Sequence, residues 1–210
     1  MSTNKLFEYD HNLRKKYPKI LGLDEVGRGC VVGPLIVVGL ILKPNYFNSE
    51  IKDSKKIKSL SKRKILKNEI IENSLFVEAI VFNSHQIDKF NPKQCSKMGM
   101  QKISEKLINH FDIVLTDYEK IESLKIKQIN LTKGDNLSYT IAAASIVAKS
   151  LRDDYLIELD KKYPEYMFIK NQGYLTKQHK NAIEKYGLIS NIYRQSYLPI
   201  KSFVLKKSFK

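Results

Sequence analysis

Two apolar stretches near the N-terminus constrain the fold most strongly, because each one predicts a buried strand. Residues 20–24 form the first, and Pro34–Leu42, with the sequence PLIVVGLIL, predicts a second strand that is buried on both faces. The residues Val31-Val32-Gly33-Pro34 between them predict a tight hairpin connection. The two strands are therefore expected to be neighbours in one sheet.

Strands and helices alternate along the rest of the chain. The helix over residues 138–162 begins with the small residues TIAAASIVA, so another element must lie close against it. The alternation indicates an α/β sheet. Because the 210 residues show no internal repeat and no long linker, we expect a single domain over residues 1–210. Further strands are predicted at Phe76–Phe82, Ile113–Asp117 and Ile126–Leu131, further helices at 57–73, 92–110 and 176–186, and an irregular tail beyond them.

Two adjacent carboxylates stand where the first strand ends. Asp24 and Glu25 are followed closely by Gly27-Arg28-Gly29. If the strand continues, neighbouring side chains point to opposite faces, and they converge only where the backbone bends. The glycines permit a bend and let a ligand approach the backbone, while the planar guanidinium of Arg28 suits phosphate. Carboxylates for metal beside a backbone that can touch a phosphodiester suggest a nuclease. The alternative is a surface turn with solvated charges.

Two later acids extend this pattern. Asp117 ends the strand IVLTD, and Asp135 lies just before the alanine-rich helix. Taken singly, Asp117 fits a turn and Asp135 fits a helix cap or an Asx turn. Clustered with the first pair, they would repel by roughly 4 kcal/mol per pair at about 4 Å and an effective dielectric of about 20, and would take up protons or bind cations. Oxygen ligands favour Mg²⁺ or Mn²⁺, and two such ions can activate water and stabilise the leaving 3′-oxygen of a phosphodiester.

The composition favours a polyanionic partner. The formal net charge is +15, and residues 52–67 concentrate it, with eight lysines or arginines against one acid. Such a cluster attracts nucleic acid or an anionic membrane surface. No apolar run approaches the roughly 18 residues of a membrane span. Cys30 and Cys95 are too few for a disulfide framework and lack the spacing of a zinc site, so we expect a protein of the reducing cytoplasm.

Four motifs, taken in order, make the chain similar to a known family. They are Gly22–Gly29 (GLDEVGRG), Asp53–Lys56 (DSKK), Lys133–Asp135 with the helix that follows, and Gly173-Tyr174 with Thr176 and His179. In this order and at these separations they resemble ribonuclease HII over about residues 20–197, nearly the whole chain. The resemblance implies the ribonuclease H-like fold: a central mixed five-stranded sheet flanked by helices, with an N-terminal arm over about residues 1–18 and a small C-terminal helical part over about 165–210.

For function, the resemblance implies an endonuclease that hydrolyses the phosphodiester 5′ of ribonucleotides, in RNA–DNA hybrids and at single ribonucleotides embedded in duplex DNA. It implies two-metal-ion catalysis with Mg²⁺ or Mn²⁺ and products with 3′-hydroxyl and 5′-phosphate ends. We expect a monomer with no membrane partner. By motif, the catalytic metal ligands are Asp24, Glu25, Asp117 and Asp135, and the nucleic-acid-binding residues are Gly27, Arg28, Gly29, Lys55, Lys56 and Tyr174.

The matched binding residues have different implied roles. The Gly27-Arg28-Gly29 turn reads the 2′-hydroxyl and the neighbouring phosphates, and Lys55 and Lys56 contact the nucleic-acid backbone. Tyr174 helps to recognise the RNA-to-DNA junction, although a tyrosine chosen at random is more often half-buried packing.

The chain departs from the family pattern at three positions. Tyr118 follows the strand-end acid where the family usually has Gly, and Cys30 follows Gly-Arg-Gly where Pro is common. Leu175 follows Gly173-Tyr174 where the family has Gly. None of these changes removes an implied ligand, so they bear on the geometry of the site and leave the local turn at Tyr118 open.

Two other interpretations stay open. One is ribonuclease HIII or another ribonuclease H-like nuclease, but ribonuclease HIII usually carries an extra N-terminal domain, and 23 residues precede Asp24 here. The other is a catalytically inactive nucleic-acid-binding domain, which the presence of all four acids disfavours.

Overall fold

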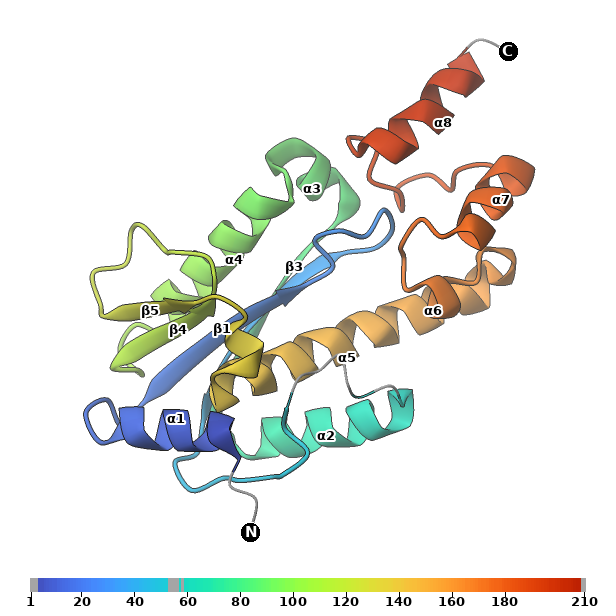
Figure 1. Cartoon of the computed structure of the whole chain (residues 1–210). Helices are drawn as coiled ribbons and strands as arrows, with labels where there is room; N and C mark the ends of the chain where they lie inside the picture. Colours follow the sequence, from blue (N-terminus) through green and yellow to red (C-terminus); the bar gives the residue numbers. More distant parts are fainter. Residues whose placement is uncertain (1–3, 53–56, 58, 209–210) are drawn as a thin grey trace. The chain divides into compact units, whose positions relative to one another are not determined.

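A mixed sheet of five strands organises the chain (Figure 1). The computed structural model describes residues 4–52, 57 and 59–208. The strand order is β3-β2-β1-β4-β5. β1 pairs antiparallel with β2 and parallel with β4, and β4 pairs parallel with β5. The predicted mixed five-stranded α/β sheet is confirmed. The strands are β1 Ile20–Val26, β2 Leu35–Leu42, β3 Ser74–Phe82, β4 Ile113–Asp117 and β5 Gln128–Leu131.

Among the described residues, four helices were not predicted from the sequence pattern: α1, α3, α6 and α8. In the described part of the chain, no helix is long and apolar enough to cross a membrane. The predicted irregular tail is wrong, because Ile200 and Phe203 of α8 pack against an apolar cluster. The helices are α1 Lys5–Arg14, α2 Leu60–Glu72, α3 Ser84–Phe90, α4 Pro92–Lys106, α5 Tyr139–Lys162, α6 Phe168–Asn171, α7 Lys177–Tyr186 and α8 Leu198–Ser208, with short 3₁₀ turns η2 Gly134–Asn136 and η3 Pro164–Tyr166.

The chain separates into two compact units. The first contains residues 1–26, 36–80 and 96–150, and the second contains residues 27–35, 81–95 and 151–210. Most of the sheet therefore belongs to the first unit, whereas the connection between β1 and β2 belongs to the second. The expectation of a single domain over residues 1–210 stays a prediction.

In the first unit, two glycines let helices approach the sheet. A Cβ on Gly22 of β1 would lie 2.7 Å from Cγ2 of Thr140 at the start of α5. A Cβ on Gly39 of β2 would lie 2.5 Å from Cγ2 of Ile103 in α4. Gly39 pairs with Leu23, the neighbour of Gly22, so the two contacts fall on opposite faces of the sheet. The small residues at the start of α5 predicted that another element lies close against this helix, and that element is β1 at Gly22.

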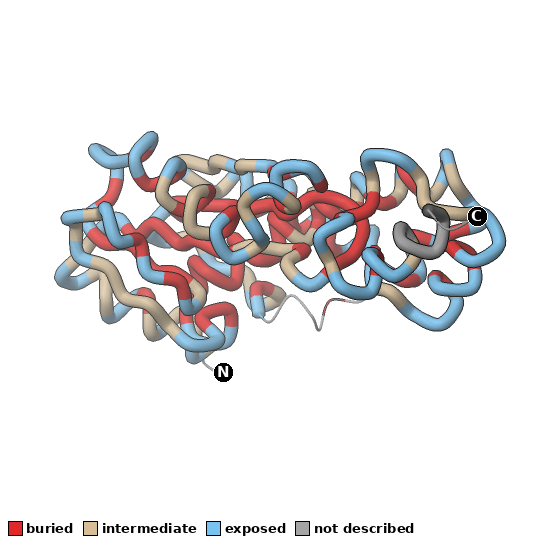
Figure 2. The backbone as a smooth tube through the Cα atoms, turned by 90° about the horizontal axis from the view of Figure 1, so that it is seen from above, coloured by how far each residue is buried: buried red, intermediate tan, exposed pale blue. Residues whose placement is uncertain are grey.

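The second unit has an apolar core of its own. Val31 and Val32, from the connection between β1 and β2, pack in it with Leu156 of α5 and Phe168 of α6. Val32 also forms a bridge with Tyr193. The predicted tight hairpin is therefore wrong: the connection is longer because its two valines are buried in this core. Figure 2 marks the buried stretches of both units in red.

Candidate active site

The first pair of acids lies at the end of β1. Asp24 is 5% exposed and Glu25 is half-buried. The strand continues to Val26, so the two side chains leave it on opposite faces. Oδ1 of Asp24 accepts a hydrogen bond from the backbone N–H of Glu25 at 2.8 Å. Burial raises the pKa of Asp24 well above its ordinary value, and the negative charge of Glu25 raises it further.

Asp117 ends β4 beside Asp24. The parallel register pairs Leu23 with Thr116, so the next residue of each strand, Asp24 and Asp117, reaches the same edge of the sheet. After burial and Glu25, the charge of Asp117 is a further cause that raises the Asp24 pKa, while a hydrogen bond with Ser145 lowers it. Two acids far apart in the sequence are thus brought into electrostatic contact.

Asp135 is placed near Asp117 by the backbone of η2. The N–H of Gly134 donates to Oδ1 of Asp117 at 2.8 Å. A Cβ on Gly134 would lie 2.7 Å from Cδ1 of Ile141 and 3.4 Å from Cα of Asp117, so glycine allows this close approach. Asp135 is buried, and its Oδ1 accepts from Nδ2 of Asn136 at 3.0 Å. All four predicted acids therefore lie in the first unit.

These acids suit a divalent cation in kind and in charge. Mg²⁺ and Mn²⁺ prefer oxygen ligands, and all four side chains supply carboxylate oxygens. The repulsion of Asp24 by Glu25 and Asp117 is one that a bound cation relieves. Within residues 4–52, 57 and 59–208, no group of three or more His, Cys, Asp or Glu side chains is already close enough to hold a metal ion.

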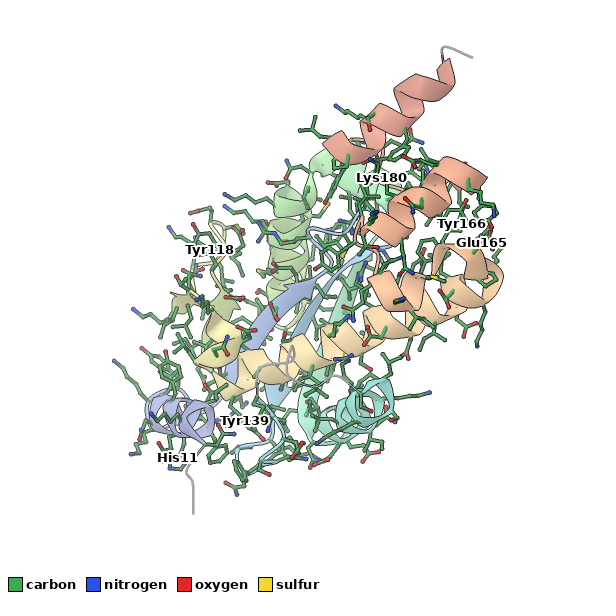
Figure 3. All side chains as sticks on the ribbon, turned by 45° about the vertical axis from the view of Figure 1, so that its right-hand side comes forward. His11, Tyr118, Tyr139, Glu165, Tyr166 and Lys180 are labelled. Atoms are coloured by element: carbon green, nitrogen blue, oxygen red, sulfur yellow. The ribbon has the colours of Figure 1, made fainter. Side chains whose placement is uncertain are left out.

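Tyr118 keeps the turn after Asp117 that a glycine would make. Its φ is 69°, in the left-handed region, and its side chain is 64% exposed (Figure 3). Its N–H donates to the carbonyl of Leu131 at 2.9 Å, which continues the pairing of β4 with β5. The left-handed backbone costs a side chain about 1–2 kcal/mol. The substitution therefore strains the backbone locally but leaves the hydrogen bond of Asp117 with Gly134 in place.

The Gly-Arg-Gly turn lies in the second unit, and its two glycines have different surroundings. Gly27 has a φ of 93°, and a Cβ there would lie 2.6 Å from the carbonyl oxygen of Pro34 and 2.8 Å from Nε of Arg152. Gly29 is exposed, and a Cβ there would lie 3.7 Å from Cε1 of Tyr174, an ordinary contact. Gly27 is thus required by the fold, whereas Gly29 presents an open face next to Tyr174.

Tyr174 combines an exposed ring with a fixed backbone. The residue is 50% exposed. Its carbonyl oxygen accepts from Nδ1 of the fully buried His179 at 2.8 Å, and Nε2 of that histidine is 2.8 Å from the hydroxyl of Tyr193. Because a carbonyl only accepts, Nδ1 carries the proton and the Tyr193 hydroxyl donates to Nε2. Burial lowers the pKa of His179, which favours this neutral form.

Two fully buried arginines bind the connection that contains the turn, and neither was predicted as a site residue. Arg152 donates to the carbonyls of Val32 and Gln172, each at 2.9 Å. Arg194 donates to the carbonyl of Gly33 at 2.8 Å and is also bonded to the turn itself. Arginine is mostly exposed in proteins, so residue type alone does not indicate such burial.

Three further residues, Arg28, Lys55 and Lys56, were predicted to bind nucleic acid. Arg28 is half-buried. Lys55 and Lys56 lie outside the described residues, so their contact with the nucleic-acid backbone stays a prediction.

Comparison with known proteins identifies the family. A family model described as ribonuclease HII matches residues 21–199. The chain is 43% identical over 202 residues to the ribonuclease HII of Mycoplasma mycoides subsp. mycoides, covering 96% of this chain and 97% of that protein.

Solved structures agree at the level of the fold. The ribonuclease H2 of Pyrococcus horikoshii matches with a TM-score of 0.71 and 21% identity, covering 91% of this chain and all of that one. Bst-RNase HIII in complex with Mn²⁺ matches with a TM-score of 0.70 and 16% identity, covering 91% of this chain and 71% of that one. The family model and the relative that match most of the chain are both ribonuclease HII rather than ribonuclease HIII. The chain therefore belongs to the ribonuclease HII family of metal-dependent endonucleases, the ribonucleases H of type 2.

Proposed function

We propose that Asp24, Glu25, Asp117 and Asp135 bind two Mg²⁺ or Mn²⁺ ions and that the site hydrolyses the phosphodiester 5′ of a ribonucleotide. Glu25 is included because its carboxylate is close enough to act on the charge of Asp24, although the two side chains leave β1 on opposite faces. The substrates are RNA–DNA hybrids and duplex DNA with single embedded ribonucleotides. The observation that carries the proposal is the parallel register of β1 and β4, which brings the buried Asp24 and the strand-end Asp117 to the same edge of the sheet. A neighbour of the same fold with Mn²⁺ bound supports the choice of metal.

The reaction needs water, a phosphodiester and a proton acceptor. The oxygen of water forms a bond to phosphorus, and the bond between phosphorus and the 3′-oxygen breaks. The 3′-oxygen takes up a proton and leaves as a hydroxyl, so the other fragment carries a 5′-phosphate. Bound ions would lower the pKa of the attacking water and would stabilise the negative charge on the leaving 3′-oxygen. The chain holds the orientation of the Asp117 carboxylate through the N–H of Gly134.

The second unit is proposed to recognise the ribonucleotide. Backbone amides of Gly27 and Gly29 hydrogen-bond the 2′-hydroxyl, and Arg28 contacts a neighbouring phosphate. A site built around a hydroxyl can reject the analogue that lacks it by roughly 10⁴–10⁵. The exposed ring of Tyr174 beside Gly29 stacks at the RNA-to-DNA junction, an interaction typically worth about 1–3 kcal/mol. Lys55 and Lys56 add backbone-phosphate contacts.

The oligomeric state and the cellular compartment of the protein are also proposed. We infer that residues 1–210 act as a monomeric single domain in the cytoplasm. Cys30 and Cys95 are both buried with free thiols, which supports a reducing compartment.

The ligand assignment is tested by Asp117→Asn. The amide keeps the size of the side chain but removes its negative charge, so we expect cleavage to fall by at least about 100-fold while affinity for the duplex stays within about twofold. Glu122→Gln is the matched control, because Glu122 is an exposed acid in the loop after β4, and we expect it to cleave like wild type. Near-wild-type cleavage by Asp117→Asn at saturating metal would show that the assignment is wrong.

A further inference from the structure

One carbonyl of the Gly-Arg-Gly turn is bound by two side chains from the C-terminal segment. The carbonyl oxygen of Arg28 accepts from Nη1 of Arg194 at 3.0 Å and from the hydroxyl of Tyr197 at 2.5 Å. Nη1 of Arg194 also lies 2.8 Å from the Tyr197 hydroxyl, so the three groups form a closed triangle. This arrangement lies entirely within the second unit.

The donors themselves are firmly held. Arg194 is 0% exposed, its Nη2 donates to the carbonyl of Gly33 at 2.8 Å, and its N–H donates to the carbonyl of Val31 at 3.0 Å. The segment between the two donors is anchored by Asp88 of α3, whose carboxylate accepts the N–H groups of Gln195 and Ser196, each at 2.9 Å. The Arg28 carbonyl is thus bound by groups that have little freedom to move.

Fixing this carbonyl also fixes the next amide. The peptide between Arg28 and Gly29 is trans and planar, so the N–H of Gly29 points opposite to the carbonyl of Arg28. With the carbonyl directed towards the buried Arg194, the N–H is directed away from it, on the exposed residue Gly29. A peptide free to rotate would present this donor in many directions, whereas a clamped one presents it in one.

We propose that Arg194 and Tyr197 are positioning residues for ribose recognition: by holding the Arg28 carbonyl, they aim the N–H of Gly29 at the 2′-hydroxyl of the substrate. The inference rests on the proposed role of the turn in reading that hydroxyl. Both act through the Arg28 carbonyl, and Arg194 is fully buried. The hydroxyl of Tyr197 is the part that can be removed most cleanly, because the ring and the contacts of Arg194 with Gly33 remain.

The test compares Tyr197→Phe with Tyr166→Phe. Tyr166, labelled in Figure 3, also lies in the second unit, and its hydroxyl donates to the carbonyl of Gly187 at 2.7 Å. Tyr166→Phe loses one hydrogen bond, to the Gly187 carbonyl, whereas Tyr197→Phe loses two, one donated to the Arg28 carbonyl and one accepted from Nη1 of Arg194. We expect Tm to fall by a few degrees in each variant. Only Tyr197→Phe removes one of the two donors that hold the Arg28 carbonyl, which then keeps the single hydrogen bond from Nη1 of Arg194. We expect its kcat/KM on a duplex with one embedded ribonucleotide to fall about 10-fold, and that of Tyr166→Phe to match wild type.

A second measurement separates positioning from general binding. The Kd for an all-DNA duplex of the same sequence, measured by fluorescence anisotropy, is expected to stay within about twofold of wild type in both variants, because this duplex has no 2′-hydroxyl to read. Equal kcat/KM in Tyr197→Phe and Tyr166→Phe would overturn the proposal, and so would a parallel loss of all-DNA affinity in Tyr197→Phe.

A third variant, Gly29→Ala, shows whether a negative result concerns only the positioning role of Arg194 and Tyr197 or also the proposed role of the turn in reading the ribose. A Cβ fits the fold there but occupies the face from which the sugar approaches. If Gly29→Ala loses cleavage and Tyr197→Phe does not, the positioning role alone is wrong. If Gly29→Ala cleaves like wild type, the turn does not read the ribose and both proposals are overturned.

Discussion

At the scale of the residue, the two glycines of the turn show how fold and recognition divide the same short motif. Gly27 has a positive φ and no room for a Cβ, whereas Gly29 has room and is exposed. The sequence shows both as glycine in a Gly-Arg-Gly turn, and only the surroundings separate a glycine that the backbone requires from one that a ligand requires.

This difference predicts that alanine destabilises the protein at position 27 and is tolerated at position 29. Gly27→Ala places a methyl group 2.6 Å from the Pro34 carbonyl oxygen at a φ of 93°, and we expect it to lower the free energy of unfolding by at least about 2 kcal/mol. Gly29→Ala should stay within about 0.5 kcal/mol of wild type. Urea unfolding of the two variants measures the difference. Equal destabilisation by both would contradict the division of roles.

The sequence predicts the four acids and the turn as site residues, but it does not predict the contacts that support them. Asp117 ends β4 and Asp24 lies two residues before the end of β1, and the parallel register of the two strands brings both residues to one edge of the sheet. The hydrogen bonds of Arg194 to the carbonyls of Arg28 and Gly33 join residues more than 160 positions apart, for which no local sequence pattern exists. Tyr118 shows the reverse case, since this departure from the family pattern has a φ of 69°, in the region that glycine adopts readily.

At the scale of the element, the start of α5 depends on α1. Oδ2 of Asp10 in α1 accepts from both the N–H and the hydroxyl of Thr140, at 2.7 and 2.5 Å. A carboxylate at a helix N-terminus satisfies a backbone donor that has no partner within the helix. Asp10 is fully buried, and burial is the main cause that raises its pKa above the ordinary value of 3.8.

The raised pKa of Asp10 predicts a pH-dependent contribution to stability. The folded state binds the proton more tightly than the unfolded state, so this contribution is fully present below the unfolded pKa near 3.8 and is lost as pH rises through the folded pKa. We therefore expect the free energy of unfolding of wild type, relative to Asp10→Asn, to fall as pH rises through this window. Denaturant unfolding of both proteins across the range measures it, and a difference that does not change with pH would contradict the account.

Periodicity predicted the sheet better than the helices. The five strands and α5 follow apolar patterns long enough to read, and β4 matches its predicted bounds. α3 was not predicted, because it has only seven residues and depends on a capping box between Asn83 and Gln86. α1 is weakly amphipathic, and the hydrogen bonds that its Asp10 accepts from Thr140 join residues far apart in the sequence, which no periodicity shows.

At the scale of the whole molecule, the positive net charge is the property that most favours a nucleic-acid partner. A formal net charge of +15 attracts a polyanion at long range, and binding that neutralises phosphates weakens as salt rises. The basic cluster over residues 52–67 is the strongest local concentration of this charge. Its proposed role concerns affinity for the duplex, in contrast to the acids, which act on the bond that breaks.

Removing two of these lysines should change the salt dependence of binding. We expect Lys55→Ala/Lys56→Ala to weaken duplex binding and to reduce the slope of log K against log salt by about 2, because each lost phosphate contact contributes about 0.9. Lys161→Ala/Lys162→Ala, two exposed lysines at the end of α5, is the matched control and should keep the wild-type slope. Anisotropy titrations over a range of salt provide the slopes. Identical slopes for the two double variants would remove Lys55 and Lys56 from the proposed interface.

The most direct test of the whole account is the position of the cut. The wild-type protein is incubated with Mg²⁺ or Mn²⁺ and a labelled DNA duplex that contains one ribonucleotide, and the products are mapped at single-nucleotide resolution. We predict a single incision on the 5′ side of the ribonucleotide, leaving a 3′-hydroxyl and a 5′-phosphate. No incision with either metal, or incision on the 3′ side of the ribonucleotide, would contradict the account.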